Sequence, residues 1–111
     1  MTTSNRDGSK RVGDQHLYSG LIVLHILHHA AKEPFYGLWI IEELGHHGYR
    51  LSPGTLYPLL HRLEKQGYLH SRQVREGRRA RRLYRATPRG RKALNSAREK
   101  VRELFGEMFE G

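Results

Sequence analysis

The hydrophobic and polar positions between Pro53 and Gln66 predict a helix with two different faces. Leucines recur at i, i+4 and i+7 and form one apolar stripe, made of Leu56, Leu60 and Leu63. A second, polar face carries Thr55, Pro58 and Arg62. This helix is therefore expected to pack on its inner side and to contact a partner on its outer side.

Local signals mark both ends of this helix. Ser52 is a favourable N-cap, and Pro53 suits the first helical position because its missing N–H has no intrahelical partner there. Gly67 is expected to close the helix before an extended segment. Pro58 removes a donor one turn inside, so we expect a tightened or bent first turn.

Two further helices are predicted before this one. The segment from Gln15 to about Lys32 is apolar nearly all round, so we expect it to be covered on both sides. Pro34 ends it, because the residue before a proline is disfavoured in the α region. A second helix spans about Tyr36 to Leu44, and the glycines that follow predict a turn over residues 45–51.

A hairpin and a last helix complete the pattern. Two extended segments, Tyr68 to Glu76 and Arg81 to Thr87, are joined by a loop over residues 77–80. Thr87 and Pro88 repeat the cap-plus-proline start of a helix. Apolar residues then recur at alternating steps of three and four, at Leu94, Ala97, Val101, Leu104 and Met108. This spacing is typical of a coiled-coil seam, and a helix packed on the core is the competing interpretation.

The elements give one mainly α domain with a small β-hairpin (α+β), a winged helix-turn-helix. Residues 1–14 are small and polar and are expected to form a loose N-terminal arm, followed by the winged domain over residues 15–87 and a C-terminal helix over residues 88–111. The first and last helices carry more apolar surface than one small core can cover. A homodimer is therefore favoured over a monomer.

Charge is concentrated in one part of the chain. The whole chain of 111 residues has a net charge of +9, whereas residues 50–92 hold thirteen lysines and arginines against only Glu64 and Glu76, a net charge of +11. Because most of these cations are arginines on a helix and a hairpin, the window indicates nucleic acid as the partner. The chain has no cysteine and no apolar run long enough to span a membrane, which favours the cytoplasm.

At this point the residues resemble a known family, the short-form PadR-type transcriptional regulators. The matching residues are Tyr36 with Gly37, the run SPGTLYPLLHRLEKQGYL at 52–69, the turn Gly77-Arg78-Arg79, and YRATPRGRKAL at 84–94. The resemblance covers about residues 16–110. It implies a dimeric DNA-binding repressor with the 53–66 helix in the major groove and the hairpin, or wing, on the backbone or in the minor groove.

The resemblance also assigns residues to these roles. The residues expected to face DNA are Tyr36, Ser52, Gly54, Thr55, Tyr57, Pro58, Arg62, Arg78 and Arg79. The first and last helices are expected to form the contact with the partner subunit. The residues expected in this contact are Leu17, Leu21, Leu94, Ala97, Val101, Leu104, Phe105 and Met108. Many members sense a small hydrophobic or phenolic effector between the subunits, and no cofactor is expected.

From chemistry alone, individual roles stay open. Arg62 is the best candidate for a base edge, with a phosphate contact as its alternative. Tyr57 suits either a phosphate contact through its hydroxyl or packing under the hairpin. Arg78 and Arg79 suit a minor groove, or are only solvated charges at the hairpin tip.

Other classes of function fit the sequence less well than a DNA-binding regulator. An enzyme is disfavoured, because the chain has no phosphate-cradling loop, paired catalytic carboxylates or nucleophile motif. A protein-interaction adaptor would have a neutral or acidic recognition face, and an RNA-binding module would carry stacked aromatics on the hairpin.

A metal-responsive regulator is a further alternative, because His25 and His29 stand at i, i+4 with His28 beside them. No carboxylate or thiol is near them in sequence, and His46 and His47 are expected in a turn, so ordinary packed histidines are preferred.

Overall fold

The computed structural model describes residues 3–111, with side chains from Leu17 onward. The loose arm expected over residues 1–14 lies outside the fully described residues, so the proposed domain boundary there stays a prediction. The elements in chain order are α1 (Thr3–Lys32), β1 (Phe35–Tyr36), α2 (Gly37–His46), α3 (Pro53–Lys65), β2 (Leu69–Glu76), β3 (Arg79–Ala86), α4 (Pro88–Phe105) and a π-helical turn, η1 (Gly106–Glu110).

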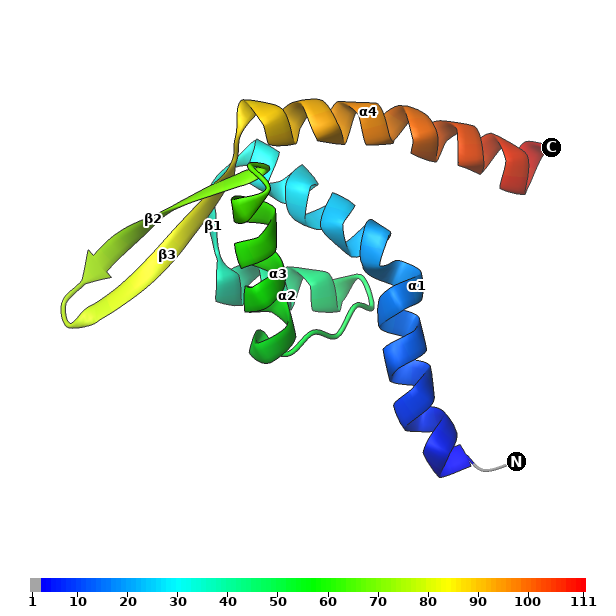
Figure 1. Cartoon of the computed structure of the whole chain (residues 1–111), viewed down its shortest axis with the longest axis horizontal. Helices are drawn as coiled ribbons and strands as arrows, with labels where there is room; N and C mark the ends of the chain where they lie inside the picture. Colours follow the sequence, from blue (N-terminus) through cyan, green and yellow to red (C-terminus); the bar gives the residue numbers. More distant parts are fainter. Residues whose placement is uncertain (1–2) are drawn as a thin grey trace.

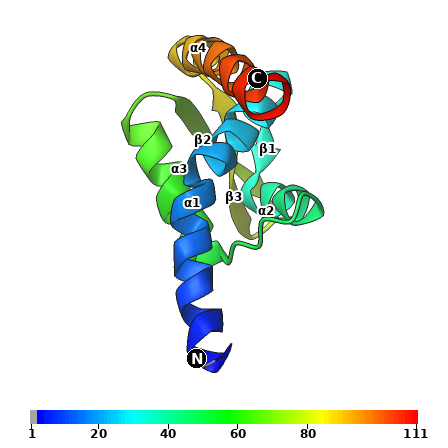
Figure 2. The ribbon, with the colours of Figure 1, turned by 90° about the vertical axis from the view of Figure 1, so that its right-hand side faces the viewer.

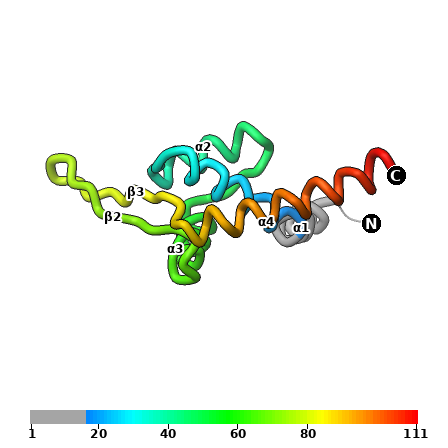
Figure 3. The backbone as a smooth tube through the Cα atoms, turned by 90° about the horizontal axis from the view of Figure 1, so that it is seen from above, coloured from blue at the N-terminus to red at the C-terminus, as the bar shows by residue number. Residues whose placement is uncertain are grey.

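The first three helices pack together, and two long elements extend from this body in opposite directions (Figures 1 and 3). The β2–β3 hairpin extends to one side and α4 to the other. The strands form an antiparallel sheet in the order β1-β3-β2. The radius of gyration is 16.0 Å, against roughly 13 Å for a compact domain of this length. These elements confirm the α+β fold class expected from the sequence.

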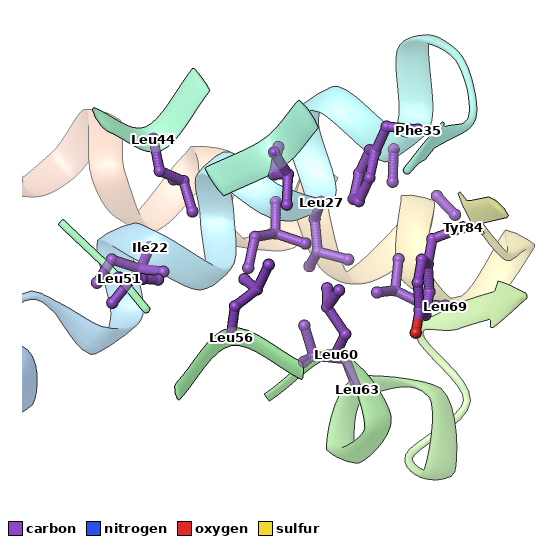
Figure 4. Close-up of a cluster of buried hydrophobic side chains, with 14 of the residues drawn as sticks. Ile22, Leu27, Phe35, Leu44, Leu51, Leu56, Leu60, Leu63, Leu69 and Tyr84 are labelled. Atoms are coloured by element: carbon purple, nitrogen blue, oxygen red, sulfur yellow. The ribbon is translucent and has the colours of Figure 1, made fainter. Parts of the chain in front are cut away.

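The core lies between α1, α2, α3 and the base of the sheet (Figures 2 and 4). The predicted stripe of α3 is confirmed, because Leu56 and Leu60 are fully buried and Leu63 is 4% exposed. These leucines meet Ile26 of α1 and Ile40 of α2 in one cluster. Burial of each such side chain contributes about 1.5–3 kcal/mol, so the stripe fixes the orientation of the polar face of α3.

Some predicted boundaries need correction. The hairpin loop is shorter than expected, because Glu76 pairs with Arg79 and only Gly77 and Arg78 form the turn. Strand β1 was not predicted, since it has two residues and exists through its pairing with β3. Helix α3 continues through Pro58, which leaves the carbonyl of Gly54 without the intrahelical N–H donor that another residue at position 58 would supply.

The start of α4 is fixed to the segment that follows α3. The Thr87 backbone N–H donates to the Tyr68 carbonyl at 3.1 Å, and the Thr87 hydroxyl donates to the Gly67 carbonyl at 2.6 Å. Gly90 is buried, and a Cβ at this position would collide with the Tyr68 carbonyl oxygen. The glycine therefore permits the close approach that sets the direction in which α4 leaves the domain.

Candidate nucleic-acid interface

The N-terminus of α3 is capped and open to solvent. The Ser52 hydroxyl accepts the Thr55 backbone N–H at 3.3 Å and donates to the Thr55 hydroxyl, also at 3.3 Å. The N–H of Gly54 belongs to the first turn, where no intrahelical carbonyl is available. Ser52, Gly54 and Thr55 are all exposed. This helix end therefore offers hydroxyls, a backbone donor and the positive end of the helix dipole, a combination that attracts phosphate.

The outer face of α3 is polar and cationic along its whole length. Thr55, Pro58 and Arg62 are exposed and lie away from the leucine stripe, as predicted. His61 and Lys65 are exposed on the same side, at three and seven residues after Pro58. The sequence reasoning did not name these two, although their spacing carried the signal.

Tyr57 packs across the first turn of α2. A Cβ built on Gly37 would lie 2.5 Å from the Tyr57 hydroxyl oxygen, so the ring occupies the space that this glycine leaves. The side chain remains 37% exposed. The Tyr57 ring is therefore packed against α2 while the residue keeps a solvent-facing side, and its phosphate contact stays a prediction.

A cleft of about 410 Å³ joins α2, α3 and the wing. Three predicted residues line it, namely Tyr36, Tyr57 and Arg79, and Arg81 lines it with them. The Arg81 guanidinium stands 3.8 Å from the centre of the Tyr36 ring and also pairs with Glu76 at 3.2 Å. The half-buried Tyr36 thus positions an arginine of the wing, and it occupies the N-cap position of α2 without a side-chain cap hydrogen bond.

The other predicted residues lie elsewhere on α3 and on the wing. Gly54, Thr55, Pro58 and Arg62 line a second groove, of about 540 Å³, against α1. Arg78 lies at the hairpin turn, where Gly77 has a positive φ of 62° at the first central position, as in type II′ turns. The expected site residues therefore surround α3 on two sides and continue out to the wing tip, instead of forming one pocket.

A hydrogen-bond network holds the wing against α3. The Ser71 hydroxyl and backbone N–H donate to the Glu64 carboxylate at 2.8 and 3.0 Å, and Arg82 donates to the Ser71 hydroxyl at 3.0 Å. Ser71 is buried. Burial, reinforced by the Glu64 charge, raises the pKa of the nearby Tyr84 hydroxyl. From the sequence, Glu64 was expected only to offset part of the positive charge, whereas in the fold its carboxylate accepts hydrogen bonds from β2 and holds the wing against α3.

The wing itself is lined with arginines on both strands. The exposed ones are Arg72, Arg75, Arg78, Arg79, Arg82 and Arg85. Only Glu76 balances them on the hairpin, and it is already paired with Arg81. Together with the outer face of α3, this arrangement forms a cationic surface whose forked donors match phosphates and guanine edges.

A second, chemically different surface lies on α1, on α4 and on the η1 turn that follows α4. Its exposed apolar side chains are Leu17, Leu21, Val101, Leu104, Phe105, Met108 and Phe109. Leu94 lies in the core and Ala97 is half-buried, so the inner end of the predicted seam packs within one chain. The expectation that the first helix is covered on both sides is wrong for a single chain, because Leu17 is 70% exposed.

A groove of about 500 Å³ separates α1 from α4 and opens on this apolar surface. Its lining is mainly aliphatic and aromatic and includes Leu21, Leu24, Val101 and Phe105, while Arg98 and His28 supply polar groups. None of the helices in the described part of the chain is long and apolar enough to cross a membrane.

A capped recognition-type helix, a basic wing and a three-helix core define a DNA-binding winged helix-turn-helix protein. Comparison with known proteins agrees with this class. Residues 26–96 match the model of the transcriptional regulator PadR-like family. The chain is 57% identical over 88 residues to Transcriptional regulator Rv3488 of Mycobacterium tuberculosis, covering 79% of this chain and 82% of that one.

Solved structures show the same fold. A PadR family transcriptional regulator from Eggerthella lenta superposes with a TM-score of 0.80 at 30% identity, covering 97% of this chain and 96% of that one. A PadR-like transcriptional regulator from Bacillus cereus gives a TM-score of 0.72 at 24% identity over 86% of this chain and 98% of its own, a likeness of fold alone. The chain belongs to the PadR-like family of transcriptional regulators.

Proposed function

We propose that this chain is a homodimeric, sequence-specific repressor that binds an inverted-repeat operator and is released by a small hydrophobic or phenolic effector. The observation that supports it best is the exposed polar face of α3, which stands beside an arginine-rich wing while the leucine face is buried. In this proposal α3 enters the major groove. Ser52, Gly54 and Thr55 fix the register on phosphates, and Arg62 reads a base edge.

The wing supplies a second contact with the same duplex. In this proposal Arg78 at the turn and Arg79 beside it reach the minor groove, whose negative potential attracts arginine. Tyr36 and Tyr57 line the cleft between this wing and α2, which orients the wing relative to α3. A protein-interaction adaptor is less compatible with this surface, because its recognition face would be neutral or acidic.

The apolar surface of α1 and α4 supports the homodimer. Leu104 and Met108 are more than half exposed, and Leu17 of α1 is exposed to a similar degree. Contact with a second copy would remove this surface from water, with a gain of about 25 cal/mol for each Å² of apolar area. Residues 88–111 serve as the dimerisation helix in this proposal. Two-fold symmetry then makes the operator an inverted repeat with half-sites about one or two helical turns apart.

The groove between α1 and α4 is the proposed effector site. It is apolar, of a size that suits a small aromatic molecule, and adjoins the proposed dimer contact. An effector that binds there better in one arrangement of α1 and α4 than in another shifts the spacing of the two α3 helices and so releases DNA.

A gel shift on the promoter region of the chain's own gene tests this function. Arg62→Ala is expected to weaken operator binding by about 1–3 kcal/mol while leaving binding to random DNA little changed. Lys100→Ala is the matched control, since it removes an exposed cation from α4, away from α3 and the wing. A repetition with phenolic acids and planar hydrophobic compounds tests release. Equal losses for Arg62→Ala and Lys100→Ala, or no binding of duplex DNA at low salt, would contradict the proposal.

A further inference from the structure

Four side chains that can bind metal converge where the C-terminal end of α2 meets α1. His25 and His29 come from α1, one turn apart, and His47 caps α2. Their closest ring nitrogens all lie within 4.8 Å of one another. The Glu43 carboxylate of α2 lies 3.5 Å from Nε2 of His29 and 3.2 Å from Nε2 of His47. The carboxylate that is missing near these histidines in sequence is therefore supplied by the fold.

These spacings are close to those of a tetrahedral zinc site. Zn–N bonds of about 2.0–2.1 Å place neighbouring ligand atoms roughly 3.3 Å apart in a tetrahedron. The two Glu43 distances already match that edge length, and the three nitrogens need to close by about 1.5 Å at most. Side-chain rotation can supply this closure, because the His25 and His47 ring centroids lie only 4.7 Å apart and the His47 side chain is 44% exposed.

The protonation states suit metal binding. Partial burial lowers the pKa of His25, and the neighbouring charges of His47, His29 and His28 lower it further. Burial also lowers the pKa of His29, although Glu43 opposes the shift. Desolvation alone raises the pKa of the Glu43 carboxyl, but the His47 hydrogen bond and the nearby histidine charges outweigh it, so the net pKa is lowered. Neutral imidazoles and an ionised carboxylate are the forms that bind a divalent ion.

We propose that His25, His29, Glu43 and His47 form a binding site for one Zn²⁺, or a similar divalent transition-metal ion, that clamps the C-terminal end of α2 to α1. Imidazole nitrogens and one carboxylate are ligands that zinc accepts, and other first-row ions compete for the same donors. The inference goes beyond the proposed function and does not depend on it, since it concerns the junction of α1 and α2 and not the DNA-facing surface.

The position of the site gives the ion a structural consequence. His47 opens the turn that leads through Leu51 to Ser52 and α3, while His25 also lines the groove between α1 and α4. An ion that bridges α1 and His47 therefore restrains the turn of the helix-turn-helix relative to the helix that carries the proposed dimer surface. A ligand that binds only the folded chain also raises its Tm.

The test is isothermal titration of the full-length, untagged chain with Zn²⁺, with Trp39 fluorescence as a second signal. Trp39 is the only tryptophan, and its ring centroid lies 5.4 Å from that of His29. We expect one zinc ion per chain, and a Tm rise of roughly 10 °C at free zinc about 100 times its Kd. Co²⁺ should give the intense visible absorption of tetrahedral coordination.

Matched variants separate this site from ordinary histidine binding. His29→Asn and His47→Asn are each expected to weaken zinc affinity by at least about 100-fold, and Glu43→Gln by at least about 10-fold. His28→Asn, one residue from His29, and His70→Asn on the wing should leave it unchanged. Because His47 is exposed, His47→Asn should keep the fold, which circular dichroism verifies.

Three results would overturn the proposal. These are absence of zinc binding by the folded wild-type chain, retention of affinity in His47→Asn, or an equal loss in His28→Asn. DNA binding is measured in parallel on the metal-free chain, so a failure of the zinc site and a failure of the repressor function give different results.

Discussion

The cationic surface of α3 and the wing differs from the surface of α1 and α4 in the side chains that it exposes. On α3 and the wing the exposed residues are mainly arginines and short polar side chains, and networks such as Glu64–Ser71–Arg82 hold them in place. On α1 and α4 the exposed residues include Leu17, Leu104 and Phe105, and the groove between these helices is open. A single chain of 111 residues thus presents a cationic surface, which we propose binds DNA, and an apolar surface, which we propose contacts a second copy. Variants that alter one surface and preserve the other test whether the two surfaces have separate roles.

The largest effect is expected from a charge on the apolar surface. Leu104→Glu places a carboxylate where a second copy should cover the helix, so the dimer is expected to dissociate. Operator affinity should then fall by at least about 100-fold, because each half-site is bound alone. Sedimentation equilibrium and fluorescence anisotropy measure the two quantities. A Leu104→Glu chain that remains dimeric would contradict the proposal that this surface forms the dimer contact. Lys100→Glu, on the same helix, is the control and should remain dimeric.

Gly90→Ala tests the close contact between the start of α4 and the Tyr68 carbonyl, which fixes the direction of α4. The added Cβ collides with the Tyr68 carbonyl, so α4 must shift and the free energy of unfolding should fall by about 1–3 kcal/mol. Urea unfolding measures this loss. Gly106→Ala is the matched control, because nothing lies within 4 Å of the Cβ that it adds to the described chain. Similar stabilities for the two variants would show that α4 is not fixed at Gly90.

Ser71→Ala tests whether the wing is held by its network. The change removes the hydroxyl that links Glu64 to Arg82 and leaves part of the carboxylate without its donor, at a cost of about 1–3 kcal/mol. Operator affinity should fall with it, because the wing angle relative to α3 is no longer fixed. Thermal melting and anisotropy report the two effects. Unchanged values in both would show that the network has no such role.

At the wing tip, a smaller effect is expected. Arg78→Ala combined with Arg79→Ala should weaken binding to operator and random DNA alike and flatten the salt dependence by about two units. Anisotropy titrations at several salt concentrations measure the slope. If specificity falls while the slope stays constant, these arginines read bases instead of phosphates.

The smallest expected effect is a pH dependence of stability in the metal-free chain. The pKa values of His25 and His29 are lowered in the folded state. Their contribution to the free energy of unfolding is therefore fully present above the unfolded pKa of about 6.5, and it is lost as the pH falls through the folded-state pKa values. The Tm should therefore fall between pH 7.5 and pH 5.5. The drop should shrink in the variant His25→Asn with His29→Asn, and an unchanged drop would assign it to other groups.

The elements that could be predicted from sequence are those whose signals are local. Ser52 and Pro53 mark the start of α3, and the spacing of Leu56, Leu60 and Leu63 gives its buried face, because a helix places residues three and four apart on one side. Features that join distant segments were missed. Strand β1 exists only because Phe35 and Tyr36 pair with β3, and two residues carry no periodic pattern.

The same distinction applies to the site. The exposure of Thr55, Pro58 and Arg62 follows from the helix period. The hydrogen bonds from Ser71 to Glu64, in contrast, depend on how β2 lies against α3. Likewise, the i, i+4 spacing of His25 and His29 was visible, but Glu43 and His47 reach them only after α2 packs on α1. Spacing within one helix was sufficient to predict the exposed face of α3. It could not predict contacts between elements, such as those of Glu64 with Ser71 or of Glu43 with His29.

The central claim, that the segment headed by Ser52 enters duplex DNA, is tested most directly by affinity cleavage. The chain has no cysteine, so Thr55→Cys provides a unique position for a tethered iron chelate at the N-terminus of α3. Two symmetric clusters of strand cleavage are expected, one in each half of an inverted repeat. Lys100→Cys, on α4, should give none. Absence of cleavage from Thr55→Cys while the labelled protein still binds the operator would contradict the account.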